Sequence, residues 1–133
     1  MDARQLFDGG GESIRLELDP SRTRGYAAVI ALCGEHDLAT STDIRIALAP
    51  LHGDVLVDLS ECEFIDSAVI GALLEKFEDL RREGHRLELL VPLDRVNVRR
   101  SVGVIGLGTL MTLHEAMPTE AARAPGDGMT NGE

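Results

Sequence analysis

The sequence predicts a single α/β domain in which helices pack on a small, mixed, mostly parallel sheet of four to five strands. Segments with the apolar pattern of strands alternate with segments of helical period, which is typical of parallel strands joined by crossover helices. The length of 133 residues is enough for one hydrophobic core and too short for two domains of ordinary size. Apolar residues make up 44% of the chain and aromatic residues only 3%, so the core must be built from aliphatic side chains.

The first elements predict an antiparallel hairpin. Residues 14–18 alternate apolar and polar side chains, as in a half-buried strand, and residues 26–33 are almost wholly apolar, as in a strand covered on both faces. Turn-forming residues separate the two segments. We expect residues 1–12, which include three consecutive glycines, to be a flexible leader, and the domain to cover residues 13–123.

The remaining elements alternate between helix and strand. The clearest is a helix that begins near Ser67, because Ile70, Leu73 and Leu80 share one face of it, and Gly84 is a natural residue to follow its end. The other expected elements are a helix over 40–51, strands over 54–59 and 86–91, a loop over 60–65, a weaker helix over 94–102, a strand over 110–113, a last helix over 118–123 and a disordered tail over 124–133.

The charge of the chain excludes several classes of partner. Its formal net charge is −10, from 13 Lys and Arg residues against 23 Asp and Glu residues, so its surface would repel nucleic-acid phosphates and anionic lipid. No stretch has the apolar length of a signal peptide or a membrane span. We therefore expect a cytoplasmic protein that binds neither nucleic acid nor membrane, with Cys33 and Cys62 as free thiols.

Two loops at one edge of the sheet form the candidate site. In parallel sheets, sites collect beyond the carboxyl ends of strands, here residues 34–37 and 60–67, and we expect these loops to be neighbours. Asp66 and Ser67 stand directly before the clearest helix, so one of them is its N-cap. The Ser67 hydroxyl is either a cap alone or a phosphoacceptor beside a helix N-terminus. Asp37 and Asp66 would orient this hydroxyl and bond a partner, rather than act as acid–base catalysts.

Several motifs resemble those of one protein family. Residues 55–60 form a hydrophobic run that ends in Asp-Leu-Ser, and residues 64–71 read Phe-Ile-Asp-Ser-Ala-Val-Ile-Gly. Together with the Gly-Glu-His-Asp turn at 34–37 and the later segments Val98-Arg99-Arg100 and Gly106-Leu107, they resemble STAS-domain anti-sigma factor antagonists over about residues 14–117. The resemblance implies a STAS-like fold for the predicted α/β domain.

The resemblance also implies a regulatory binding protein, not an enzyme. In the family, the serine that matches Ser67 is phosphorylated by an anti-sigma factor that is also an ATP-dependent serine kinase. The unphosphorylated form binds this partner and frees a sigma factor, phosphorylation ends the interaction, and a phosphatase restores it. No cofactor is implied, and self-association into a homodimer stays open. The residues expected to contact the partner are Gly34, Glu35, Asp37, Asp66, Ser67, Ala68, Val69 and Ile70.

One position departs from the family pattern. Where the family usually has Gly, this chain has Val69, whose β-branched side chain would fill the space that a glycine leaves for another backbone. Either the kinase is reshaped to match Val69, or the chain is a constitutive binder that has lost the switch. The alternative function is a STAS scaffold or ligand-sensing module that works without phosphorylation.

Two weaker alternatives use the same loops. Ser67, His36 and Asp37 contain the residue types of a hydrolytic triad, but adjacent His and Asp in one turn do not readily adopt the geometry of a base and its orienting group. Cys33, His36 and Cys62 could converge on zinc, but Cys-x-x-His with one distant Cys is an incomplete ligand set. We therefore expect neither a catalytic site nor a metal site.

Overall fold

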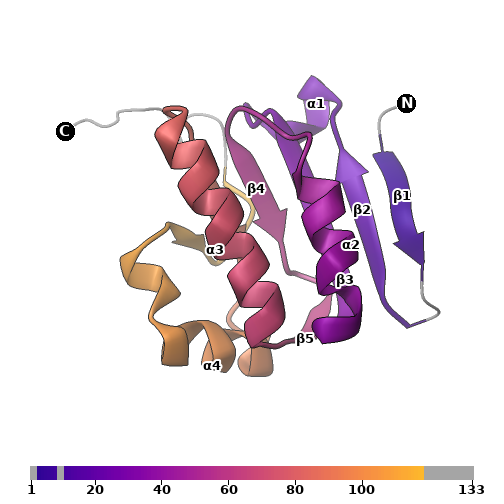
Figure 1. Ribbon diagram of the computed structural model, residues 1–133, viewed down its shortest axis with the longest axis vertical. Helices are drawn as coiled ribbons and strands as arrows, with labels where there is room; N and C mark the ends of the chain where they lie inside the picture. The colour runs from indigo at the N-terminus through magenta and orange to yellow at the C-terminus, as the bar shows by residue number, and fades with distance from the viewer. Residues whose placement is uncertain (1–2, 9–10, 119–133) are drawn as a thin grey trace.

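The α/β class is confirmed by the computed structural model, which describes residues 3–8 and 11–118 (Figure 1). Its strands are β1 (Ala3–Asp8), β2 (Ser13–Glu17), β3 (Ala28–His36), β4 (Val55–Asp58), β5 (Cys62–Ile65), β6 (Leu87–Leu90) and β7 (Leu113–His114). The sheet has the order β1-β2-β3-β4-β6-β7, and β5 pairs with the carboxyl-terminal end of β3. The first three strands are antiparallel and all other pairs are parallel, so the sheet is mixed and mostly parallel as predicted, with seven strands rather than four to five.

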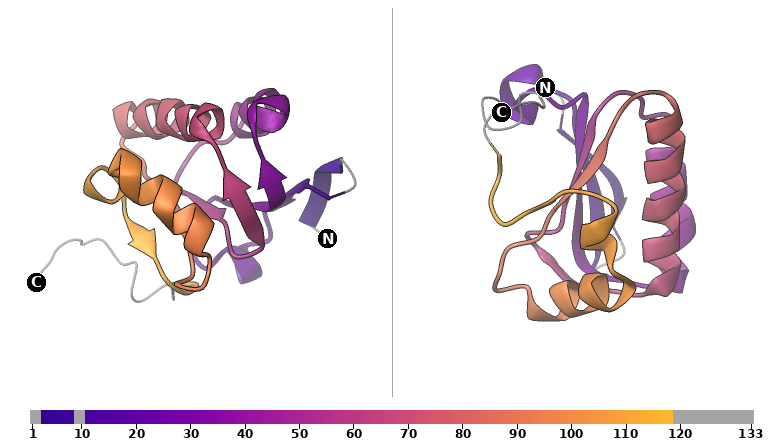
Figure 2. Two further views of the ribbon diagram at one scale, coloured as in Figure 1. Left: turned by 90° about the horizontal axis from the view of Figure 1, so that it is seen from below. Right: turned by 90° about the vertical axis from the view of Figure 1, so that its left-hand side faces the viewer.

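Two long helices cover one face of the sheet. Helices α2 (Leu38–Leu48) and α3 (Ser67–Arg82) lie side by side on that face, and α4 (Val96–Ile105) crosses the end of the sheet where α3 begins (Figure 2). The short elements are α1 (Pro20–Thr23) and the 3-10 turn η1 (Leu107–Thr109). None of the described helices has the length and apolar character needed to cross a membrane.

The main core lies between the sheet and these helices. The alternation predicted for residues 14–18 is confirmed, because Ile14 and Leu16 are buried beneath the helices while Arg15 between them is exposed. On α3, the predicted apolar face is buried as well, and Gly84 follows the helix with a φ of +84°. The largest fully buried side chains of this core are Ile14, Ile30, Leu32, Ile44, Leu48, Leu59, Ile65, Leu73, Leu80, Leu87 and Leu89.

The opposite face of the sheet holds a smaller cluster with one buried charge. Tyr26 packs there, and its hydroxyl donates a hydrogen bond to Glu88, which is only 3% exposed. His114 Nε2 lies 3.0 Å from the same carboxylate, and Arg86 forms an ion pair with it. Glu88 is therefore buried with partners that compensate its loss of water.

Several element boundaries differ from the sequence-based expectations. β1 lies within residues 1–12, which the sequence predicts to be a flexible leader, and β5 lies within the expected loop over 60–65. β3 continues to His36, so most of the Gly34–Asp37 turn is strand, and α2 begins at Leu38 rather than near residue 40. The expected strand over 110–113 is shifted, because β7 starts at Leu113. The expected helix over 118–123 and the tail over 124–133 lie outside the described residues, apart from Pro118.

Candidate functional site

The starts of α2 and α3 meet at one carboxylate. Asp66 is the N-cap of α3, and its Oδ1 accepts hydrogen bonds from the backbone N–H groups of Ala68 at 3.0 Å and Val69 at 3.2 Å. Its Oδ2 accepts a third bond, at 3.1 Å, from the N–H of Leu38 at the start of α2. The backbone N–H of Asp66 donates to the carbonyl of His36 at 3.2 Å. The two predicted loops are therefore neighbours, and Asp66 joins them.

The Ser67 hydroxyl is free at the surface. Ser67 is the first residue of α3, is exposed, and forms no side-chain hydrogen bond within the described residues. Because Asp66 already accepts from the N–H groups of Ala68 and Val69, the Ser67 side chain is not the cap. The interpretation of this serine as a cap alone is therefore wrong, and its hydroxyl is left open to solvent.

The surface around Ser67 is acidic. Asp37 is the N-cap of α2, and its Oδ1 accepts a hydrogen bond from the N–H of Ala39 at 2.9 Å. Asp37 and the nearby Glu35 are exposed, and among the described side chains neither they nor Asp66 form an ion pair. The carboxylates therefore add negative charge to this surface without a direct ion-pair partner among the described side chains.

His36 belongs to the core, not to a triad. It is fully buried, with Nδ1 lying 3.0 Å from Thr40 Oγ1 and Nε2 lying 2.9 Å from the carbonyl oxygen of Cys33. A carbonyl only accepts, so Nε2 carries the proton and Nδ1 can accept from the Thr40 hydroxyl. Neither ring nitrogen is available to a serine at the surface, and this geometry opposes the hydrolytic alternative.

The two cysteines also point to separate structural roles. Cys62 is buried, and this burial raises the pKa of its thiol to about 11. The Cys33 sulfur accepts a hydrogen bond from Arg15 Nη2 at 3.3 Å. Within residues 3–8 and 11–118, no group of three or more His, Cys, Asp or Glu side chains is arranged to hold a metal ion.

Burial corrects the expected set of partner contacts. The side chains of Val69 and Ile70 are 0% and 4% exposed, so both face the core rather than a partner. The expectation that Val69 blocks the approach of another backbone to Ser67 is therefore wrong. Of the other expected contacts, Glu35, Asp37 and Ser67 are exposed, whereas Gly34, Asp66 and Ala68 are half-buried.

Gly34 has a structural reason to be glycine. It adopts a φ of +86°, which favours glycine, and a Cβ added there would lie 2.1 Å from the carbonyl oxygen of Gly11. The pairing register between β3 and β5 also shifts between Gly34 and Glu35. The first residue of the Gly-Glu-His-Asp motif is thus explained by chain packing within the fold.

Two exposed apolar side chains on the segments that meet at Asp66 were not predicted from the sequence. Leu38 is 71% exposed at the start of α2, and Phe64 is 40% exposed on β5. The sequence does contain a signal for Leu38. It directly follows Asp37, the cap of its helix, and it does not share the apolar spacing of Ile44, Ala47 and Leu48, which form the buried face of α2. The sequence contains no comparable signal for Phe64, because apolar and polar residues do not alternate regularly over residues 60–65.

Comparisons with known proteins agree with this architecture. A family model described as "Mlab, STAS domain" matches residues 21–115. An anti-sigma factor antagonist from Mycobacterium paratuberculosis is 22% identical with a TM-score of 0.61, and the match covers 68% of this chain and 78% of that one. The Bacillus cell fate determinant SpoIIAA in its phosphorylated form is 25% identical with a TM-score of 0.51, over 65% of this chain and 80% of that one. No curated protein matches the chain.

Proposed function

The chain belongs to the STAS-domain family, and from this premise we propose that it is an anti-sigma factor antagonist switched by phosphorylation of Ser67. In its unphosphorylated form it binds, in the cytoplasm, an anti-sigma factor of the serine-kinase type and thereby releases a sigma factor. Phosphorylation of Ser67 by this partner ends the interaction, and a phosphatase restores it. In this role the chain is a binding module and a kinase substrate rather than an enzyme.

The observation that carries this proposal is the free hydroxyl of Ser67. It stands exposed at the first position of a 16-residue helix, while the neighbouring Asp66 does the capping. A kinase could therefore transfer a phosphoryl group to Ser67 without first breaking a hydrogen bond of the fold. The burial of Val69 supports the same reading, because its side chain leaves the approach to Ser67 open.

The geometry supplies a mechanism for the switch. A phosphate on Ser67 carries a charge of about −1.5 to −2 and would lie next to the Asp66 carboxylate. It would repel this carboxylate and compete with it for the N–H groups of Ala68 and Val69 at the helix start. Because Asp66 also holds Leu38, the same repulsion would act on the start of α2. Phosphorylation would thus change both the charge and the shape of the surface that meets the partner.

The composition of the surface indicates what the partner must offer. The exposed Leu38 and Phe64 lie on the segments that meet at Asp66, which precedes Ser67 in the chain, and they provide apolar area for a contact. Glu35 and Asp37 surround them with negative charge, which favours a partner with basic residues at the rim of its binding site. A phosphate added to such a surface would remain close to these acidic groups, so its repulsion would be felt throughout the contact.

The relatives support the proposal at the level of their described roles. The Mycobacterium protein is described as an anti-sigma factor antagonist, and SpoIIAA has a structure in a phosphorylated form. A protein with this fold can therefore carry a phosphate and remain folded. Transfer of this behaviour to the present chain rests on the match of Ser67 to the family serine and on its free hydroxyl.

The direct test is phosphorylation by the anti-sigma factor of the native host. The protein is incubated with the purified kinase and ATP, and the products are measured by intact mass and fragment mapping. We expect one phosphate, on Ser67, and none on the Ser67→Ala variant. Complexes formed with and without ATP are then separated by size, and ATP is expected to dissociate the complex of the wild type only.

A matched control is available within the chain. Ser21 is also exposed and lies two residues after the aspartate cap of α1, but its hydroxyl donates a hydrogen bond to Asp19 at 2.8 Å. Ser21→Ala should be phosphorylated like the wild type. Phosphate on a residue other than Ser67, or equal labelling of Ser67→Ala and wild type, would show that Ser67 is not the switch.

A further inference from the structure

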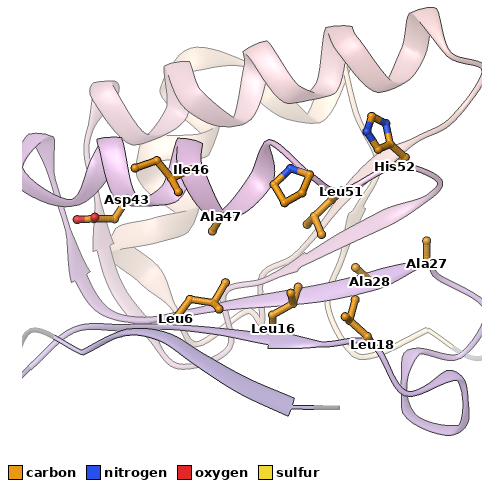
Figure 3. A pocket seen from close by; sticks show the side chains of 11 residues that line it. Leu6, Leu16, Leu18, Ala27, Ala28, Asp43, Ile46, Ala47, Leu51 and His52 are labelled. Carbon is orange, nitrogen blue, oxygen red and sulfur yellow. The ribbon is translucent and has the colours of Figure 1, made fainter.

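A second concave site lies on the opposite side of α2 from α3. It is a groove of about 580 Å³ between α2 and the N-terminal strands, and its volume is typical of small-molecule sites (Figure 3). The groove exists because β1 and β2 extend the sheet past the edge of the helical layer (Figure 2). None of the residues that line it contributes to the surface around Ser67.

The floor and walls of the groove are apolar. Leu16 and Ala28 from the sheet and Ala47 from α2 line it and are nearly fully buried. Leu6 on β1 and Ile46 on α2 lie on opposite sides, and they are 42% and 66% exposed (Figure 3). A ligand between these two side chains would remove their apolar surface from water, which is the main driving force for binding in such a site.

The charged side chains at the rim of the groove determine which ligand head group is favoured. Asp43 stands at one end of the groove, is half-buried, and forms no hydrogen bond or ion pair within the described residues (Figure 3). His52 stands at the other end, and its ring already lies 3.1 Å from Glu83. The rim therefore offers a carboxylate that has no ion-pair partner among the described side chains, in a chain whose net charge of −10 already disfavours anions.

We propose that this groove binds a small cationic amphiphile, with its alkyl chain between Leu6 and Ile46 and its ammonium group near Asp43. The concave shape favours a small molecule over a flat protein surface, and the carboxylate favours an amine over a carboxylate or phosphate ligand. The proposal concerns a site separate from Ser67, so it stands whether or not Ser67 is phosphorylated. It gives the chain a ligand-binding function in addition to partner binding.

Three ligands that share one alkyl chain test the proposal. Octylamine, 1-octanol and octanoate are titrated into the full chain by calorimetry, each well below the concentration at which it aggregates. We expect saturable binding of one octylamine per chain, with 1-octanol weaker and octanoate weakest. Asp43→Asn should weaken octylamine binding about two- to fivefold and leave 1-octanol unchanged, since it removes only the ion pair.

Variants inside and outside the groove test whether the ligand binds there. Ile46→Ser removes an apolar wall at an exposed position and should weaken octylamine and 1-octanol about tenfold. Leu38→Ser makes the same change on the same helix outside the groove and should leave both affinities unchanged. Circular dichroism establishes that the variants are folded, and Leu6→Ser provides a second wall variant on another element.

Four outcomes would overturn the proposal: no saturable binding of octylamine, tighter binding of octanoate than of octylamine, equal effects of Ile46→Ser and Leu38→Ser, or a change in molecular mass when Ile46 is replaced. The last result, measured by light scattering, would mean that a second copy of the chain occupies the groove.

Discussion

Replacement of Asp66 by alanine should destabilise the domain more than replacement of the other helix cap, Asp37. Asp66 accepts three backbone hydrogen bonds, two from the start of α3 and one from Leu38 of α2. Within the described residues, the Asp37 side chain accepts one backbone bond, from Ala39 in its own helix. Both aspartates are N-caps with extended backbones, so the pair compares a cap that bonds only its own helix with a cap that also bonds the neighbouring helix.

The expected magnitudes follow from these bonds. Loss of an N-cap costs about 1 kcal/mol, and loss of a further hydrogen bond costs about 0.5 to 1.5 kcal/mol. Asp66→Ala should therefore cost about 2 kcal/mol and Asp37→Ala about 1 kcal/mol. Asp66→Asn keeps one oxygen acceptor but loses the second, so its cost should lie between zero and that of Asp66→Ala.

Urea unfolding followed by far-ultraviolet circular dichroism measures these costs, because the chain has no tryptophan for fluorescence. A loss of 2 kcal/mol corresponds to a fall of about 1 M in the urea midpoint for a small domain. If Asp66→Ala is no more destabilising than Asp37→Ala, the bond between Asp66 and Leu38 does not couple the two helices. The mechanism proposed for the phosphate would then lose its effect on α2.

Four further predictions concern Ser67, Val69 and the cysteines. Ser67→Ala should retain binding to the anti-sigma factor while Ser67→Asp weakens it, because a carboxylate would face Asp66; equal affinities by calorimetry would contradict electrostatic switching. Val69→Gly should destabilise the domain by about 2 to 3 kcal/mol, since it empties a buried position and places glycine in a helix, and a urea titration that finds no loss would contradict this. At pH 8, iodoacetamide should label Cys33 faster than Cys62, whose pKa burial raises to about 11, and equal labelling in the folded state would be evidence against that burial. Because the folded pKa of Cys62 lies above the ordinary thiol value of 9.0, stability should be unaffected below pH 9 and should fall as the pH rises from 9 towards 11.

The sequence was most informative where local pattern and burial coincide. The alternation of residues 14–18 predicted β2 because one face of that strand is buried, and the apolar face of α3 was readable for the same reason. β5 was missed because it is defined by pairing with residues 34–36, far away in the chain, and its central residues Glu63 and Phe64 are both exposed. Pairing partners distant in sequence leave no local trace in so short a strand.

Val69 was misread although the sequence contained the correct signal. It precedes Leu73 by four residues and Leu80 by eleven, spacings that place all three on one helix face, and all three are fully buried. The glycine of the family pattern at this position suggests that Val69 lies at the surface, whereas its helical spacing correctly places it on the buried face. The identity of the cap was also open from sequence, because Asp and Ser are both good caps and only the hydrogen bonds of Asp66 decide between them.

The close approach of Gly34 to Gly11 changes what the motif at 34–37 means to someone comparing sequences. The glycine at position 34 reflects a close approach of two chain segments, since any side chain there would collide with the backbone of Gly11 just before β2. The fourth letter of the motif, Asp37, is the start signal of a helix. A related protein whose chain takes another path before β2 would have no such collision at that position. Absence of glycine there in a homologue would then indicate a different N-terminal hairpin, and would carry no information about whether that protein still recognises the same partner.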